Sequence, residues 1–171
     1  MTDTYSTRSL FVSSGYWMAT GGPEDFERFT DEAFSAPEWN GVIRPSAEGG
    51  MVAVATQTQW DELHLSVYLY EAPPSLDTDG WDTVVDISIL AHPSPEPGDD
   101  GHPVAYLAFL DDGSPAEEAP DPIVLPAPGG APAWWRLRFQ ARTLDGMPEE
   151  HCFQLWPAER QSEAQHKVPK T

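Results

Sequence analysis

Apolar and polar residues alternate with a period of two in three segments, residues 62–71, 81–90 and 134–142. Neighbouring side chains of a strand point to opposite faces, so this period predicts three strands that each bury one face. In the third segment, the predicted outward residues are Trp134, Arg136, Arg138, Gln140 and Arg142. The predicted inward residues are Leu63, Leu65, Val67 and Leu69, then Trp81, Thr83, Val85, Ile87 and Ile89, and then Trp135, Leu137, Phe139 and Ala141.

Shorter apolar runs between proline- and glycine-rich turns add further candidate strands. About eight strands with one-sided alternation are typical of an all-β fold, and we expect an antiparallel, jelly-roll-like β-sandwich. The shorter runs are residues 9–14, 51–56, 104–110, 122–126 and 151–157.

Residues 23–34 have a helical period instead. Pro23 suits the first helical position, and Phe26, Phe29, Ala33 and Phe34 recur on one face. We expect one short helix that covers an edge or an end of the sandwich.

The chain of 171 residues is most simply one domain. We expect a flexible N-terminus at 1–7, the sandwich at 8–157 and a disordered polar tail at 158–171, because the last segment lacks any period. The proline-rich segment 91–103 is expected to be a mobile loop.

The start of the chain shows no signal-peptide pattern, and no apolar run is long enough to span a membrane. The single cysteine, Cys152, cannot form an internal disulfide. A single cysteine fits a reducing compartment, so a cytoplasmic location is expected.

Acidic residues dominate the chain, whose formal net charge is −19 at pH 7. Residues 45–135 hold 16 Asp or Glu residues and no Lys or Arg. This charge disfavours binding to nucleic acid and to anionic membranes, because contacts to phosphate depend on Lys and Arg. Solubility is a sufficient explanation of the acidic block, and steering of a basic protein partner is the alternative.

The stretch SLDTDGWD, residues 75–82, places three aspartates around Gly80. It matches an EF-hand loop only in part, because the twelfth position is Asp86 and the flanks predict strands rather than helices. We interpret Asp77, Asp79 and Gly80 as a hairpin turn. A calcium site shared between the aspartate-rich loops of a C2-like sandwich remains the alternative.

No recognised catalytic or cofactor-binding motif occurs in the sequence. His92 and His102 flank a proline-rich loop without zinc-ligand spacing. His151 and Cys152 adjoin, but neighbours on a strand point apart, so we expect Cys152 to be a small buried residue. The sequence therefore predicts no enzyme, no metal and no cofactor, although carboxylate chemistry without a motif stays conceivable.

Tryptophan and arginine share the outward face of segment 134–142. An exposed row of Trp134, Arg136 and Arg138 has the composition of an interface hot spot. Pairing with an adjacent acidic strand is the other interpretation.

The order of several short segments resembles the competence protein J family. The segments are FTDEAF (29–34), WNGVI (39–43), WDTVVDISI (81–89), the LP…GG turn (125–130), WWRLRFQAR (134–142) and FQLWPA (153–158). The resemblance covers residues 8–158 and implies a small β-sandwich of the kind whose type member inhibits a DNA-entry nuclease. Insertions at 91–103 and 111–133 depart from the pattern, so it assigns no site residue.

The sequence thus predicts a non-enzymatic domain that binds a basic protein, such as a nuclease or a toxin. The alternative is a sandwich that binds calcium or a small ligand through its aspartate-rich loops. The predicted partner-binding residues are Asp77, Asp79, Asp82, Asp86, Asp99, Asp100, Asp111, Asp112, Trp134, Arg136 and Arg138.

Overall fold

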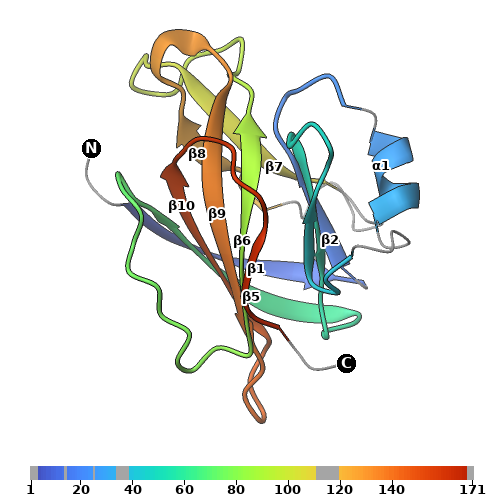
Figure 1. Cartoon of the computed structure of the whole chain (residues 1–171). Coiled ribbons are helices and arrows are strands. Elements are labelled where there is room, and N and C mark those ends of the chain that lie inside the picture. Colours follow the sequence, from blue (N-terminus) through green and yellow to red (C-terminus); the bar gives the residue numbers. More distant parts are fainter. Residues whose placement is uncertain (1–3, 14, 25, 34–38, 111–119, 169–171) are drawn as a thin grey trace.

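Two β-sheets packed face to face form the protein in a computed structural model, which describes residues 4–13, 15–24, 26–33, 39–110 and 120–168 (Figure 1). The predicted all-β sandwich is confirmed. In spatial order, the larger sheet holds β1 (Thr4–Val12), β5 (Asp61–Leu69), β10 (Glu150–Pro157), β9 (Ala133–Arg142), β6 (Thr83–Ala91) and β11 (Ala164–Lys167). The smaller sheet holds β3 (Ile43–Pro45), β4 (Met51–Ala55), β2 (Gly15–Ala19), β7 (Val104–Leu110) and β8 (Ile123–Pro126).

The core lies between the inner faces of the two sheets. Its largest fully buried side chains include Phe139 and Phe153 of the larger sheet and Met18 and Ile43 of the smaller one. Alternation along β5, β6 and β9 places the apolar sets as predicted, except for Trp81, which precedes β6. The larger sheet is antiparallel apart from the parallel pair β5–β10.

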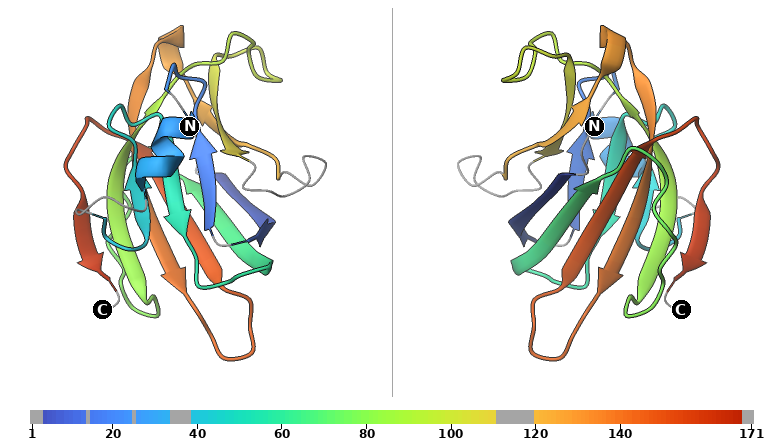
Figure 2. Two further views of the ribbon diagram at one scale, coloured as in Figure 1. Left: turned by 90° about the vertical axis from the view of Figure 1, so that its right-hand side faces the viewer. Right: turned by 90° about the vertical axis from the view of Figure 1, so that its left-hand side faces the viewer.

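The single described α-helix, α1 (Phe26–Ala33), covers the outer face of the smaller sheet rather than an edge or an end (Figure 2). Phe29 packs edge-on against Trp17 with ring centroids 5.6 Å apart, and Ala33 is buried in the same cluster as Ala53. Trp17 and Ala53 point away from the core, so this apolar outer patch needs the helix as its cover.

The predicted hairpin between the segments at 62–71 and 81–90 is wrong. Strands β10 and β9 lie between β5 and β6 in the sheet, so residues 70–82 form a link that passes across the outer face (Figure 1). Gly80 does adopt a positive φ of 74°, and the predicted turn is present within this link. The turn lies in a crossover connection and not in a hairpin, because β5 and β6 pair with strands from distant parts of the chain and not with each other.

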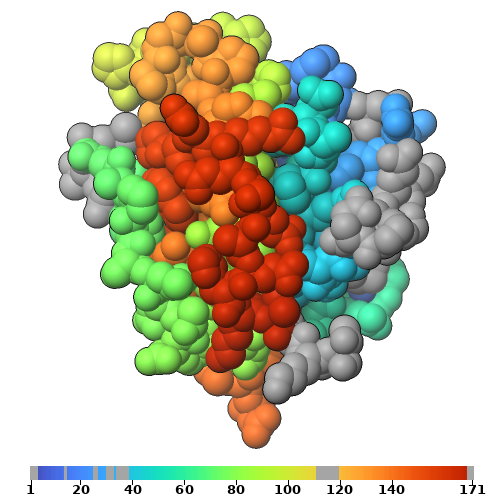
Figure 3. Space-filling view, in the orientation of Figure 1, coloured from blue at the N-terminus to red at the C-terminus, as the bar shows by residue number. Residues whose placement is uncertain are grey.

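Both ends of the chain carry strands where unstructured segments were expected. β1 begins at Thr4, and β11 lies within the predicted tail and pairs with the edge of β6. Residues 158–163 contact Ser88 and Arg136 on the outer face of the larger sheet, and β11 extends that sheet beyond β6. This C-terminal segment is the red surface at the front of Figure 3. No helix in the part of the chain that the structure describes is long and apolar enough to cross a membrane.

Candidate functional site on the outer face of the larger sheet

The predicted Trp–Arg row points outward but is not exposed. Arg136 and Arg138 are only 3% and 5% exposed, because two segments that cross the outer face, the link at 70–82 and residues 158–163, cover them. Arg136 donates to the carbonyls of Gln161 and Ser162 at 3.2 and 2.9 Å, and burial lowers its pKa. Trp134 is half-buried, with the guanidinium of Arg160 4.9 Å from its ring centroid. The expectation of an exposed hot-spot row is therefore wrong.

Asp86 and Arg138 form an ion pair beneath this cover. Arg138 Nε lies 2.8 Å from Asp86 Oδ1, and His166 Nε2 of β11 lies 3.2 Å from Asp86 Oδ2. Arg138 also donates to the carbonyls of Pro74 and Ser75 in the link at 3.4 and 3.3 Å. These residues fit the other interpretation, in which an arginine pairs with an adjacent acidic strand. The same charged groups also hold the covering segments in place.

The aspartates of the link accept hydrogen bonds from backbone amides, as aspartates in turns commonly do. Asp77 Oδ1 accepts a hydrogen bond from the Asp79 amide at 2.9 Å, and Asp82 Oδ2 accepts one from the Thr143 amide at 2.9 Å. All three carboxylates remain exposed. Among the residues described, no group of three or more His, Cys, Asp or Glu side chains is arranged to hold a metal ion.

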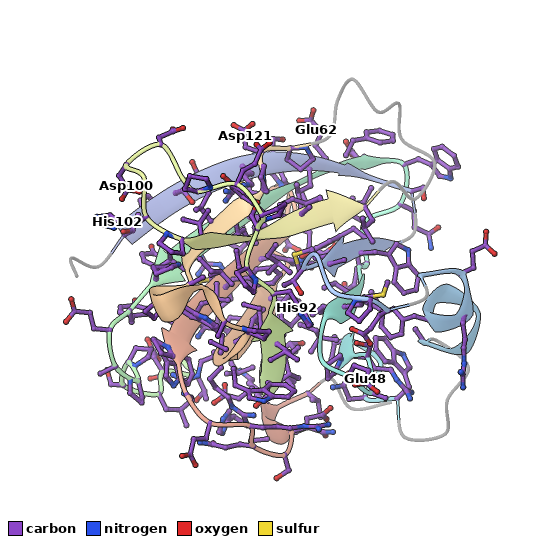
Figure 4. The ribbon with its side chains drawn as sticks, turned by 90° about the horizontal axis from the view of Figure 1, so that it is seen from above. Glu48, Glu62, His92, Asp100, His102 and Asp121 are labelled. Atoms are coloured by element: carbon purple, nitrogen blue, oxygen red, sulfur yellow. The ribbon has the colours of Figure 1, made fainter. Side chains whose placement is uncertain are left out.

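The remaining predicted acidic residues belong to other loops. Asp99 and Asp100 lie in the loop after β6, at the top of Figure 1, where Asp100 Oδ1 accepts from the His102 amide at 3.0 Å. Figure 4 shows Asp100 and His102 close together on that loop. Asp111 and Asp112 lie outside the described residues. The described members of the predicted partner-binding set thus do not form one continuous surface, and the role of the set in binding stays a prediction.

An open hollow of about 560 Å³ occupies the part of the outer face that the two crossing segments leave uncovered. We call it the outer hollow. Its outward-facing lining residues come from four elements and the link, and they are Tyr5, Thr7, Ser9, His64, Ser66, Trp81, Arg142 and Glu150.

Trp81 lies on this outer face instead of in the core. Strand β6 begins at Thr83, so Trp81 belongs to the link, and the Arg142 guanidinium lies 4.8 Å from its ring centroid. The Arg142 side chain also meets Glu150 Oε2 at 2.5 Å, which offsets its charge. The Trp81 carbonyl accepts a hydrogen bond from Lys167 of β11. These contacts fix an indole ring at one wall of the outer hollow.

Exposed aromatic rings continue along β1 and β5. Tyr5 is 56% exposed and stands 4.7 Å from the ring of Tyr68. At the other end of β1, Phe11 is 42% exposed and Trp60 is 75% exposed, with ring centroids 6.4 Å apart. Trp60 has a φ of 56°, a conformation that a bulky side chain rarely adopts. Large apolar rings held in water at both ends of one strand are typical of a binding surface.

A buried polar chain connects the two sheets beneath the hollow, and sequence reasoning missed it. The Tyr16 hydroxyl on β2 lies 2.8 Å from His151 Nδ1 on β10, and His151 Nε2 lies 2.9 Å from Glu149 Oε1. Glu149 also accepts from the amides of Gln57 and Thr58, at 3.0 and 2.7 Å. The sequence showed only a histidine at the start of the candidate strand 151–157, which by itself predicts no partner.

This chain resembles a hydroxyl–histidine–carboxylate relay, but its groups are internal. An ionised carboxylate only accepts, so His151 Nε2 donates to Glu149 Oε1. Burial and the nearby Glu149 charge raise the pKa of Tyr16 well above its ordinary value. Both imidazole nitrogens are engaged inside the protein, so the geometry favours a structural role for the chain.

Comparisons with known proteins give a fold relation and no family. No protein-family model matches the sequence, and no curated protein matches it. A solved structure described as "Crocagin biosynthetic gene J" is similar, with a TM-score of 0.51 and 13% identity over 94% of this chain and 100% of that chain. At this identity the likeness shows the fold alone. The comparisons do not support the resemblance to the competence protein J family. They support only a weak similarity in fold to this solved structure.

Proposed function

We propose that this protein is a non-enzymatic binding protein for a basic protein partner, and that the outer hollow is where the two meet. The observation that carries the proposal is the hollow itself, about 560 Å³ in volume and flanked by exposed aromatic rings on an acidic protein. Aromatic rings attract the cationic groups of Lys and Arg through their π-faces.

The charges around the hollow support a cationic occupant. Glu62 is exposed on β5 and holds Ser9 by a hydrogen bond of 3.0 Å. The single arginine in the outward-facing lining, Arg142, is paired with Glu150, so its positive charge is offset. The net charge of −19 would steer a basic partner towards the protein and speed its association. A nuclease or toxin whose active face attracts phosphate is one such partner.

The chemistry of the buried groups also supports binding rather than catalysis. Burial raises the pKa of Cys152 to about 12, so its reactive thiolate form is scarce at neutral pH. Cys152 and His151 point to opposite faces of β10, so they do not form a nucleophile–base pair.

Matched variants test the proposal. Tyr5→Ser and Glu62→Gln alter the outer hollow and its flank, and their controls are Met147→Ser and Glu96→Gln, at exposed positions outside it. Tagged proteins are used to capture partners from the source organism at low and at high salt. We expect a basic protein that the two hollow variants retain several-fold less than wild type does, and that high salt releases.

The controls decide between a site and general charge attraction. If Glu96→Gln weakens capture as much as Glu62→Gln does, binding follows net charge and the hollow is not the contact. Capture that does not depend on salt would contradict the electrostatic part of the proposal.

A further inference from the structure

The four sheet edges of this sandwich differ in how they are protected. An edge strand exposes backbone groups that can pair with another chain, and proteins block this with short strands, prolines, bulges or charges. β3 has three residues and ends at Pro45, and β8 has four residues and ends at Pro126. β11 has four residues and a register shift between Gln165 and Lys167. Three of the four edges therefore carry a protective feature.

β1 carries almost none of these features. It has nine residues in unbroken register with β5, from Thr4 opposite Leu69 to Val12 opposite Asp61. It contains no proline and no lysine, and β5 is its one partner among the described strands. Its outward residues Tyr5, Thr7, Ser9 and Phe11 are all exposed. A strand of this length and regularity is a template for one more strand.

Arg8 is the one charged residue of β1, and it is already engaged. Its Nε donates to the carbonyl of Asp121 at 2.7 Å, and its Nη2 donates to the carbonyl of Pro122 at 3.0 Å. Its guanidinium also lies 5.9 Å from the ring centroid of Phe109. Arg8 therefore ties β1 to the smaller sheet, and its charge does not project along the edge to repel an incoming strand.

We propose that an extended segment of the basic partner adds to the larger sheet as a strand beside Tyr5–Phe11. This inference rests on the proposed function and names the mode of binding. Alternate side chains of the added strand would lie next to the row of Tyr5, Thr7, Ser9 and Phe11, at the open side of the outer hollow. Seven residues of strand span about 23 Å, so the segment would reach from one exposed aromatic ring to the other.

Charge favours a cationic segment over a second copy of this chain. Asp61 and Glu62 of β5 lie opposite Val12 and Phe11, and both are exposed. A second copy would bring another net charge of −19 to the same edge. Lys or Arg at alternate positions of the added strand would instead meet carboxylates and aromatic rings.

The test uses two peptides with the same sequence and charge. The first is a blocked nine-residue peptide that alternates lysine with valine and threonine. The second is identical but N-methylated at every other residue, so that one of its edges cannot donate backbone hydrogen bonds. Binding to the full chain is measured by calorimetry, and amide hydrogen exchange is followed for Tyr5–Phe11 by NMR.

We expect the unmodified peptide to bind about tenfold or more tightly than the methylated one, since several backbone hydrogen bonds are at stake. It should also slow exchange of alternate amides in β1, and the methylated peptide should not. Equal binding of the two peptides overturns strand addition while leaving the proposed cationic partner in place. Absence of binding by both overturns strand addition.

A second copy as the occupant is a separate outcome. Sedimentation of the protein alone would then show a dimer at micromolar concentration, and the alternate β1 amides that face away from β5 would be protected before any peptide is added. That result overturns the proposal, whereas the proposal requires a monomer in which the β1 amides that face away from β5 exchange readily.

Discussion

Glu149 is the residue on which the buried polar chain depends most. Glu149 is 6% exposed, and its carboxylate accepts hydrogen bonds from His151 and from two backbone amides. Burial alone would raise the pKa of Glu149, but the hydrogen bond and charge of His151, together with Thr58, lower it to about 2. A buried carboxylate with this many donors stabilises the folded state only while all of the donors stay in place.

Replacing Glu149 by glutamine should destabilise the protein. The amide keeps the shape but loses the charge, and its NH2 group cannot accept from the donors that face it. We expect the free energy of unfolding in urea to fall by about 2 kcal/mol at pH 7. Glu96→Gln, at an exposed loop position, is the control and should change it little. A loss as small as that of the control would mean that the network contributes little to stability.

The same carboxylate should make stability depend on pH in a defined window. Folding lowers its pKa from 4.5 to about 2, so its contribution is complete above pH 4.5 and is lost as the pH falls towards 2. The gap in unfolding free energy between wild type and Glu149→Gln should therefore narrow across this window. Urea denaturation at several pH values measures it, and a gap that stays constant would contradict the assignment.

Cys152 should react slowly in the folded protein. The side chain is 3% exposed by residue, and burial raises its pKa to about 12. Because the thiolate is the reactive form, alkylation by iodoacetamide at pH 8 should be at least tenfold slower than in the urea-unfolded chain. Mass spectrometry of quenched samples gives both rates. Similar rates would show that this part of β10 opens readily.

At the scale of elements, the link at 70–82 depends on Arg138. The bidentate contact with Asp86 and the bonds to two link carbonyls come from one planar guanidinium, a geometry that lysine cannot reproduce. Arg138→Lys should lower the free energy of unfolding by about 2 kcal/mol and speed chymotrypsin cleavage after Leu76. Arg160→Lys, at an exposed arginine that also covers a tryptophan ring, is the control. Unchanged cleavage would show that other contacts hold the link.

The alternation of apolar and polar residues along the chain predicted most of the strands of this sandwich but not their order in the sheets. β7 occupies the predicted residues 104–110, and β5, β6 and β9 lie within two residues of their predicted bounds. β2, β3 and β11 were missed because these short strands lack the run of branched apolar residues that marked the equally short β4 and β8. The hairpin error at Gly80 arose because a turn signal fixes the local chain direction, whereas β9 and β10 enter from distant sequence.

At the scale of the whole molecule, the candidate site was the part that sequence could predict least. Period two correctly placed Arg136 and Arg138 outward, yet segments that cross the sheet bury them, and no local pattern encodes such a cover. The outer hollow draws Tyr5, His64 and Trp81 from three separate segments, so only the assembled fold brings them together. Net charge was visible from the start, because it does not depend on how the chain folds.

That charge makes a final prediction about the intact protein. A net charge of −19 on 171 residues repels itself more strongly in the compact state than in the unfolded chain. Added salt screens this repulsion, so the melting temperature should rise by a few degrees between about 0.02 M and 0.5 M sodium chloride. Calorimetry at pH 7 measures the shift in melting temperature of wild type, of Glu62→Gln and of Glu149→Gln. Attractive pairs such as Asp86–Arg138 are buried and resist screening, so a melting temperature that falls with salt would mean that exposed ion pairs outweigh the repulsion.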